Sequence, residues 1–339
     1  MRFIRTLRVC ATAAALPLAL AACGDSGTTK TVTATPSPGA TTSSTTATAC
    51  APVVGSKFVV LTDDKQLQNS DNIVPVVRTK VLTPALRTAL DKVSAALTQD
   101  ALTALNKATD VDRVQPKQAA AAFVKSAGLT AGLSGGKGRI RVVAANFSEN
   151  QSLANVYADV LTAAGFSANV KQLTSRDVYL PALQRGDVDV IPEYAASLTE
   201  SLNQKANGKA APPRATPDIA KTVAALRPLA AAEGLSVLTP AAATDQNVFV
   251  VTTAFANKYG VKTLSELVSK CAGGVTLGAA PECPTNHFCQ VGLEKTYGLK
   301  ITGFTALDAG GPLSKNALKT GKVALAELFS SDASLTAAS

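Results

Sequence analysis

The clearest alternation of apolar and polar positions lies between Ile140 and Leu202. An apolar run at residues 140–144 predicts a strand, and further strands are predicted at 168–173 and 188–191. A first helix is expected after residue 147, because apolar side chains recur there at the spacing of one helix face, at Leu153, Val156, Tyr157, Val160 and Leu161. A second helix is expected between the last two strands. This β-α-β-α-β order predicts a mainly parallel sheet with helices on both faces.

Polar and aromatic residues follow the predicted carboxyl ends of these strands. Asn146, Ser175 and Tyr194 each lie just beyond such an end. Parallel sheets of this kind bind ligands at that edge, so these residues are candidates for a binding site. Two of them also have an ordinary structural explanation: Asn146 as a helix cap and Tyr194 as a core tyrosine with a paired hydroxyl.

The pattern on either side of this stretch predicts more α/β structure. Residues 57–128 contain two β-like runs, FVVL and IVPVVR, followed by three helical stretches. Residues 129–138 are rich in Gly and predict a flexible connector. From about residue 247 a smaller unit of alternating strands and helices extends to residue 329, and the tail at 330–339 shows no periodicity.

The N-terminal segment has the pattern of a secretory signal. Residues 1–22 combine a basic start, an apolar stretch and a small-residue end. Leu20-Ala21-Ala22-Cys23 is similar to a bacterial lipobox, in which the cysteine is lipidated and becomes N-terminal after cleavage. An ordinary signal peptide followed by a stray cysteine is the alternative. After Cys23, residues up to 56 are mostly Thr, Ser, Pro and Ala and predict a disordered tether. We therefore expect a protein anchored to the membrane outside the cytoplasm.

Composition and charge exclude some partners. The chain has 339 residues, of which 46% are hydrophobic and 17% are charged, which suits one large or two ordinary globular domains. The formal net charge is +9 and falls to +6 once Arg2, Arg5 and Arg8 leave with the signal. The sequence has no basic run with interleaved aromatic residues, so nucleic acid is not an expected partner.

The remaining cysteines are even in number. Cys50, Cys271, Cys283 and Cys289 predict two disulfides in an oxidising compartment, with three pairings possible. Cys283 and Cys289 could close a tight loop, which would leave Cys50 to pair with Cys271. A zinc site is the alternative, because His287 lies between two of the cysteines. The sequence has no C-x-x-C pair, and we expect no metal.

Four segments carry a resemblance to a known family. IRVVAANFSENQ, LTSRDVYLPALQRGDVDVIPEY, GLEKTYGLK and VVLTDDKQLQNSDNIVPVVR resemble the substrate-binding proteins of glycine betaine, carnitine and choline ABC importers. The resemblance implies a two-lobed fold of the type II periplasmic binding protein kind, which closes like a hinge around a small solute and docks on a permease. Lobe one would comprise residues 57–128 plus 139–246, and lobe two residues 247–329.

The order of these segments differs from the family order. In the family, the strand corresponding to Ile140 opens the domain, and the segment corresponding to FVVLTDDK follows FSSDA and closes it. Here residues 57–128 come first, so we expect a circular permutation in which residues 129–138 join the usual ends. A disulfide between Cys50 and Cys271 would then tie the new start to lobe two.

The resemblance also implies a ligand site. In the family, quaternary ammonium groups sit in a cage of aromatic faces and are held by cation-π attraction. Tyr194 and Phe329 match cage aromatics, Ser197 matches a nearby hydroxyl, and Ser175 matches a polar contact. On composition alone Phe329 would be a core residue.

Several positions depart from the family pattern. Asn247 stands where many members have a tyrosine, Lys315 lies where another tyrosine is expected, and Ala145 replaces a basic residue. A more polar solute, held by Asp245, Gln246 and Asn247, is therefore an alternative. Asp245 could supply the counter-charge for a cation, although Asp and Asn are also common turn formers.

The sequence thus predicts a receptor and no enzyme. His287 is the only histidine, and no serine-nucleophile, H-E-x-x-H or Walker motif is present. We expect a monomeric receptor, without a cofactor, that delivers a betaine- or choline-type solute to an ABC importer. The alternatives are a binding protein for an amino acid or polyamine, a sensory receptor, an adhesive or scaffolding lipoprotein and a secreted hydrolase.

Overall fold

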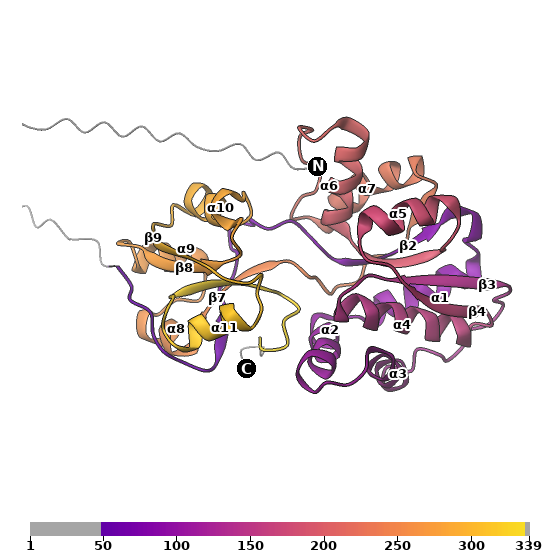
Figure 1. Cartoon of the computed structure of the whole chain (residues 1–339), viewed down its shortest axis with the longest axis horizontal. Helices are drawn as coiled ribbons and strands as arrows, with labels where there is room; N and C mark the ends of the chain where they lie inside the picture. The colour runs from indigo at the N-terminus through magenta and orange to yellow at the C-terminus, as the bar shows by residue number, and fades with distance from the viewer. Residues whose placement is uncertain (1–48, 336–339) are drawn as a thin grey trace, which may run out of the picture. The chain divides into compact units, whose positions relative to one another are not determined.

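The computed structural model describes residues 49–335 (Figure 1). The predicted signal peptide, Cys23, the tether up to residue 48 and the last four residues of the predicted tail lie outside the described residues. Among the helices of the described part, none is both long and apolar enough to span a membrane. The α-helices are α1 (Pro84–Ala96), α2 (Gln99–Asn106), α3 (Pro116–Ser126), α4 (Ser148–Ala163), α5 (Arg176–Arg185), α6 (Ala195–Asn207), α7 (Ile219–Ala232), α8 (Thr253–Tyr259), α9 (Leu264–Lys270), α10 (Gln290–Gly292) and α11 (Pro312–Lys319).

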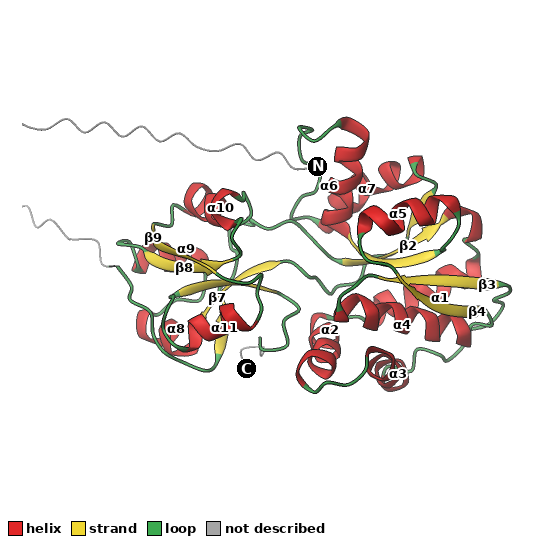
Figure 2. Cartoon of the chain, viewed as in Figure 1, coloured by secondary structure: helices red, strands yellow, loops and turns green. Residues whose placement is uncertain are grey.

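The strands form two five-stranded sheets, ordered β4-β3-β5-β2-β6 and β9-β8-β10-β7-β1 (Figure 2). We call the first sheet with its helices lobe one and the second lobe two. The strands are β1 (Phe58–Val60), β2 (Ile73–Arg78), β3 (Arg139–Ala144), β4 (Ser167–Gln172), β5 (Val190–Tyr194), β6 (Leu235–Val237), β7 (Asn247–Thr252), β8 (Val275–Ala279), β9 (Ile301–Ala306) and β10 (Leu325–Phe329). Short 3-10 turns occur at Thr79–Val81 and Cys283–Thr285, and π-helical turns continue α2 and α10 at Lys107–Val111 and Leu293–Tyr297.

Both sheets are mixed, with one strand running against the others. In lobe one, β3 is parallel to β4 and β5, whereas β2 is antiparallel to both of its neighbours. In lobe two, β7 is antiparallel to β1 and β10, and β8 is parallel to β9 and β10. The prediction of mainly parallel sheets flanked by helices is confirmed, with β2 and β7 as the reversed strands.

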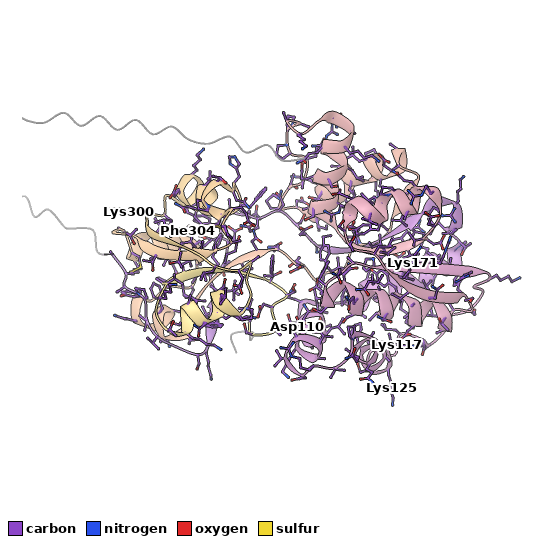
Figure 3. The ribbon with its side chains drawn as sticks, in the orientation of Figure 1. Asp110, Lys117, Lys125, Lys171, Lys300 and Phe304 are labelled. Atoms are coloured by element: carbon purple, nitrogen blue, oxygen red, sulfur yellow. A yellow bond between two sulfur atoms is a disulfide. The ribbon has the colours of Figure 1, made fainter. Side chains whose placement is uncertain are left out.

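Helices cover both faces of each sheet. Buried side chains of α1, α3 and α4 pack on one face of the lobe-one sheet, and those of α5, α6 and α7 pack on the other. In lobe two, α8 and α9 share one core with β7 and β8, while α11 packs on the opposite face. Outward positions are charged: Lys117 and Lys125 of α3 point away from the core, and Lys171 lies on the edge strand β4 (Figure 3).

Local sequence signals explain most of the helix starts. Thr263 and Glu266 form a capping box at α9, and Thr98 caps α2. Helix α4 has no side-chain cap, because it begins at Ser148 and Phe147 occupies the cap position. Pro75 lies in β2, inside the sheet. The pairing of β2 with β6 begins only at Val76, so no β6 partner requires the N–H group that proline lacks. The Pro75 carbonyl accepts a hydrogen bond from Leu238.

Two predicted boundaries need correction in the N-terminal part. Strand β1 pairs with β7, so lobe one does not begin at residue 57 and the first strand belongs to lobe two. The predicted tether is also too long, since Ala49 bridges to Gly274 and Gly55 donates a hydrogen bond to the Lys319 carbonyl. Within the predicted connector, Leu129 is buried, so this segment packs on lobe one.

The structure contains the disulfides Cys50–Cys271 and Cys283–Cys289. Of the three pairings that the sequence allows, this is the one in which the two near cysteines close a short loop. The carboxylate of Glu327 lies within 4.8 Å of both sulfurs of that loop. Because the sulfurs are bonded to each other, they are not available as thiolate ligands for zinc.

Candidate functional site

A cavity of about 910 Å³ is lined by residues of both lobes. Two segments that connect the lobes form part of its wall, residues 68–71 between β1 and β2 and residues 245–247 at the start of β7. Helices α5 and α6 supply another part. Of the residues predicted to bind a ligand, the lining includes Tyr194, Ser197, Asp245, Gln246, Asn247 and Phe329.

The strand ends of lobe one hold Tyr194 in place. Tyr194 is the last residue of β5, and α6 begins directly after it. The buried amide of Asn150 accepts a hydrogen bond from the Ala145 amide at 2.8 Å and donates one to the Pro192 carbonyl at 2.9 Å. These bonds tie the ends of β3 and β5 together. Strand ends that are fixed in this way keep the tyrosine ring at the cavity wall.

Four aromatic side chains line the cavity, two more than the sequence predicted. Phe147 is 44% exposed, and its ring centroid lies 6.1 Å from that of Tyr194. Phe329 ends β10 and is the cross-strand partner of Asn247, so the two residues meet at the same edge of the lobe-two sheet. Phe288 comes from the loop closed by Cys283–Cys289. Aromatic side chains from both lobes therefore border the cavity.

Two carboxylates lie where the connecting segments pass the cavity. Asp71 accepts hydrogen bonds from the amide and the hydroxyl of Ser197, at 2.9 and 2.5 Å. Asp245 accepts one from the Ser331 hydroxyl at 2.7 Å. In the described part of the chain, no lysine or arginine forms an ion pair with either carboxylate. Both are therefore available to balance a positive charge in the cavity.

Burial and mutual repulsion change the ionisation of these acids. Burial, followed by the charge of Glu149, raises the pKa of Asp245 to about 8. Burial also raises the pKa of Asp71. Glu149 is 5% exposed, and burial raises its pKa although Tyr194 and Asn106 donate hydrogen bonds to it at 2.6 Å each. A cation placed among these groups would favour their ionised forms.

Three basic residues line the cavity, and two of them are already paired: Arg176 with Glu193 and Lys205 with Glu233, whereas Lys209 is exposed. The guanidinium of Arg176 donates two hydrogen bonds to Glu193, at 3.1 and 2.7 Å. Glu193 is fully buried and also accepts a bond from the Tyr179 hydroxyl at 2.7 Å. This bidentate pair fixes the side chain of Arg176, a residue of the cavity lining, at the start of α5.

Three predicted ligand residues are not part of the lining. Ser175 occupies the cap position of α5, and its neighbour Arg176 reaches the cavity instead. Asn146 is exposed and accepts a hydrogen bond from Gln172. Lys315 forms an ion pair with Asp332 at 2.7 Å.

Sequence reasoning missed the residues whose position depends on long-range pairing. Asp71 and Phe288 lie in loops without periodicity, and Glu149 looks like an ordinary first-turn acid of a helix. Arg176 is the neighbour of the predicted residue Ser175, but its partner Glu193 lies in another element, β5. A signal for Phe288 existed in the two flanking cysteines, which mark a constrained loop.

The fold and the cavity define a two-lobed solute-binding protein. The model of the family described as the substrate binding domain of the ABC-type glycine betaine transport system matches residues 40–126 and 138–338. The chain belongs to this family, whose members are extracytoplasmic receptors of ABC importers. No curated protein matches the chain significantly.

Solved structures show more distant likenesses. A glycine betaine/carnitine/choline ABC transporter protein is 20% identical over 56% of this chain and 68% of its own, with a TM-score of 0.41. A substrate binding protein from Microbacterium hydrocarbonoxydans, complexed with 4-hydroxybenzoate hydrazide, is 14% identical over 53% of this chain and 46% of its own, with a TM-score of 0.26. A periplasmic murein tripeptide binding protein is 10% identical over 55% and 43%, with a TM-score of 0.23. The family assignment rests on the family match.

Proposed function

We propose that this receptor delivers a small quaternary ammonium solute of the betaine or choline type to the permease of an ABC importer. The supporting observation is that Tyr194, Phe329, Phe147 and Phe288 border one cavity. Aromatic faces attract a quaternary ammonium group by about 0.5 to 2 kcal/mol for each good contact. The carboxylates of Asp71 and Asp245, which have no ion-pair partner among residues 49–335, add attraction for the same charge.

The charge pattern favours a cation such as choline over a zwitterion such as glycine betaine. A zwitterion needs a donor for its carboxylate, and Ala145 stands where the family often has a basic residue. Of the basic residues that line the cavity, Arg176 and Lys205 are paired with Glu193 and Glu233, and Lys209 is exposed. Adding a carboxylate to the ligand near Asp71 and Asp245 would also place like charges together.

A polyamine is the second candidate ligand, and the same acids favour it. The charges of Glu149 and Asp71 both raise the pKa of Asp245, so several acids lie near one another and the region can hold more than one positive charge. A diamine would also match the hydrogen-bond acceptors at Gln246 and Asn247. Quaternary ammonium groups cannot donate such bonds, which makes the two classes distinguishable by experiment.

Hinge closure is part of the proposal. The lobes are connected by residues 61–72 and 238–246, and the segment after β10 runs beside the second connection. The Gln99 amide donates hydrogen bonds to the Thr244 carbonyl at 3.1 Å and the Ser330 carbonyl at 2.9 Å, which ties these segments to lobe one. Small-angle scattering should record a decrease in the radius of gyration when ligand is added. An unchanged radius at saturation would contradict closure.

A thermal-shift panel tests the proposed function. The purified protein is heated with choline, glycine betaine, carnitine, putrescine and single amino acids, and each ligand is recovered to check for turnover. A ligand at 100 times its Kd should add about 2.7 kcal/mol of stability. Tyr194→Ala should lose most of this gain, while Lys315→Ala, outside the cavity, should keep it. Silence across the panel contradicts the proposed solute class, and a hit with turnover favours the hydrolase alternative.

Membrane anchoring is proposed from Cys23, which lies outside the described residues. A lipidated Cys23 would keep the receptor near its permease at the outer face of the membrane. We expect the anchored receptor to be a monomer. Membrane fractionation of the Cys23→Ala variant tests the anchoring. Release of the variant into the medium is expected, and retention equal to wild type would contradict lipid anchoring.

We also propose that the chain order is circularly permuted. The two sheets have the same strand connections only if β10 is taken to be followed by β1. In lobe one, β3, β4, β5 and β6 then follow one another before the chain crosses to β7 of lobe two. In lobe two, β8, β9, β10 and β1 follow one another before the chain crosses to β2 of lobe one. Leu335 packs on the cluster that contains Phe58, so the two ends lie near the same core. A chain relinked from residue 335 to residue 57 and opened within 129–138 should fold and keep its ligand affinity, whereas a relinked chain that does not fold would contradict the permutation.

A further inference from the structure

The loop from Cys283 to Cys289 brings lobe-two side chains into the cavity. Its disulfide links residues 6 positions apart, and both cysteines are buried in the lobe-two core. Between them, Asn286 and Phe288 belong to the cavity lining. The loop is thus fixed to the core at both ends and presents its middle to the ligand space.

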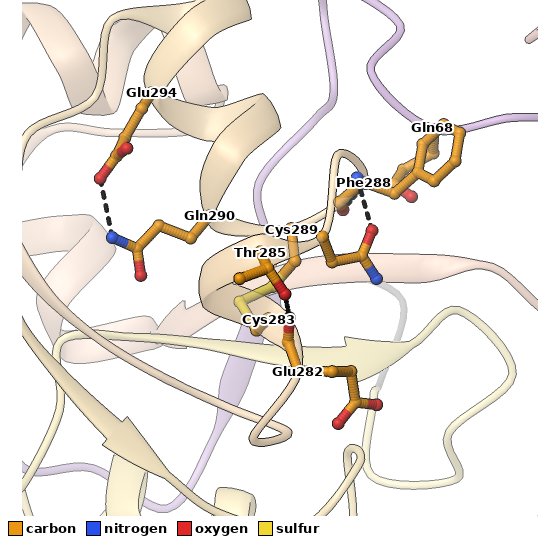
Figure 4. Close-up of a disulfide and its surroundings, with 9 residues drawn as sticks. Gln68, Glu282, Cys283, Thr285, Phe288, Cys289, Gln290 and Glu294 are labelled. Carbon is orange, nitrogen blue, oxygen red and sulfur yellow. Dashed lines mark hydrogen bonds between the residues drawn. A yellow bond between two sulfur atoms is a disulfide. The ribbon is translucent and has the colours of Figure 1, made fainter. Parts of the chain in front are cut away.

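Hydrogen bonds fix the aromatic residue within this loop. The Asn286 carbonyl oxygen of the side chain accepts a bond from the Phe288 amide at 2.8 Å. The Gln68 side-chain amide donates to the Phe288 carbonyl at 2.7 Å, which joins the loop to the segment connecting the lobes (Figure 4). A Cβ at Gly292 would overlap the His287 carbonyl oxygen and the Leu67 side chain, so the loop lies tightly against the helix that follows.

Phe288 supplies a second aromatic side chain from lobe two to the cavity. The stretch GGPLSKNAL supplies no aromatic residue for lobe two, and Phe329 is then the one predicted aromatic on that side. Phe288 is half-buried and shares the cavity lining with residues of α5 and α6 of lobe one. A second lobe-two aromatic would allow the ligand cation to be enclosed from both lobes.

We propose that Phe288 is a ligand-contacting residue and that the Cys283–Cys289 disulfide positions it for binding. This inference rests on the proposed function of the cavity. The disulfide acts on affinity through the ring that it holds in place, because an open loop would have to order itself each time a ligand binds. The predicted ligand chemistry at this position is a quaternary ammonium group, which the ring attracts through its face.

The test uses calorimetric titration of choline and of glycine betaine into wild type, Phe288→Ala, Phe288→Tyr and the double variant Cys283→Ser/Cys289→Ser. Phe288→Ala should weaken the Kd of the bound probe by about 2- to 30-fold, and Phe288→Tyr should restore it. The loop variant should weaken binding to a similar extent. The matched control is Cys50→Ser/Cys271→Ser, which removes a disulfide whose cysteines do not line the cavity and should leave the Kd within twofold of wild type.

A double-mutant cycle separates positioning from a general loss of structure. Opening the loop in the Phe288→Ala background should add little further loss, because the disulfide acts through that ring. Equal losses in both backgrounds, or a Phe288→Ala variant with wild-type affinity, would overturn the inference while leaving the proposed function intact. Wild-type protein that binds neither probe would overturn the proposed quaternary ammonium function and this inference with it.

Discussion

Replacing Asp245 with asparagine should remove a pH dependence from cation binding. Burial, followed by the charge of Glu149, raises the pKa of Asp245 from 3.8 to about 8. In the empty receptor this carboxyl group is therefore mostly protonated at pH 6 and mostly ionised at pH 9. A bound cation favours the ionised form, so affinity should fall as the pH is lowered.

The size of the effect follows from the raised pKa. If the cation binds only when Asp245 is ionised, the apparent association constant scales with the ionised fraction. For a pKa of about 8, this fraction is about 0.01 at pH 6 and about 0.9 at pH 9. Wild type should thus lose roughly 90-fold in affinity between pH 9 and pH 6, or about 2.7 kcal/mol.

Calorimetric titration with choline measures this directly, because the charge of choline does not change with pH. Asp245→Asn should bind more weakly than wild type at pH 9 and show a nearly flat profile from pH 6 to pH 9. Asp177→Asn is the matched control, since Asp177 is an exposed carboxylate of the same lining and its loss should leave the slope unchanged. A wild-type Kd that varies less than threefold over this range would refute the reasoning, and so would a slope retained in Asp245→Asn.

Three further changes probe the stability of the fold. Cys50→Ser/Cys271→Ser should lower the free energy of unfolding by about 2 to 4 kcal/mol, because the disulfide closes a long loop, and an unchanged denaturant midpoint would count against this role. Arg176→Met should cost about 3 kcal/mol in denaturant unfolding by leaving the fully buried Glu193 without its cation, and a cost below about 1 kcal/mol would contradict that pairing. Burial, followed by the charge of a neighbouring glutamate, raises the pKa of Glu327 to about 7. At pH values just below 7, the folded protein therefore keeps a proton on Glu327 that the unfolded chain has released. Its contribution to stability is therefore present at low pH and lost as the pH rises through about 7, and Glu327→Gln should raise the Tm relative to wild type more at pH 8 than at pH 5; equal differences at both pH values would exclude this titration.

Local patterns in the sequence predicted most elements of the fold. The stripe from Leu153 to Leu161 predicted α4, and the short apolar runs predicted the strands of both sheets, because each signal lies within one element. The lobe to which β1 belongs could not be predicted in this way. A three-residue strand has too little pattern to specify its partner, and its pairing with β7 joins residues almost 200 positions apart.

The candidate site was predictable where it follows strand ends. Tyr194 and Asn247 lie at the edge that a parallel sheet offers to ligands. Ser175 was predicted in place of Arg176 because the direction of a side chain in the first turn of α5 depends on the buried partner Glu193. Phe288 required knowledge of how a disulfide loop packs, which depends on contacts made by distant residues.

The structure of the receptor with choline bound is the most direct test of its proposed function as a quaternary ammonium receptor. We predict the quaternary nitrogen within about 6 Å of the Tyr194 ring centroid, with Asp245 as the nearest carboxylate and aromatic rings of both lobes around it. Choline bound away from Tyr194, or an empty cavity at saturating choline, would contradict the proposal.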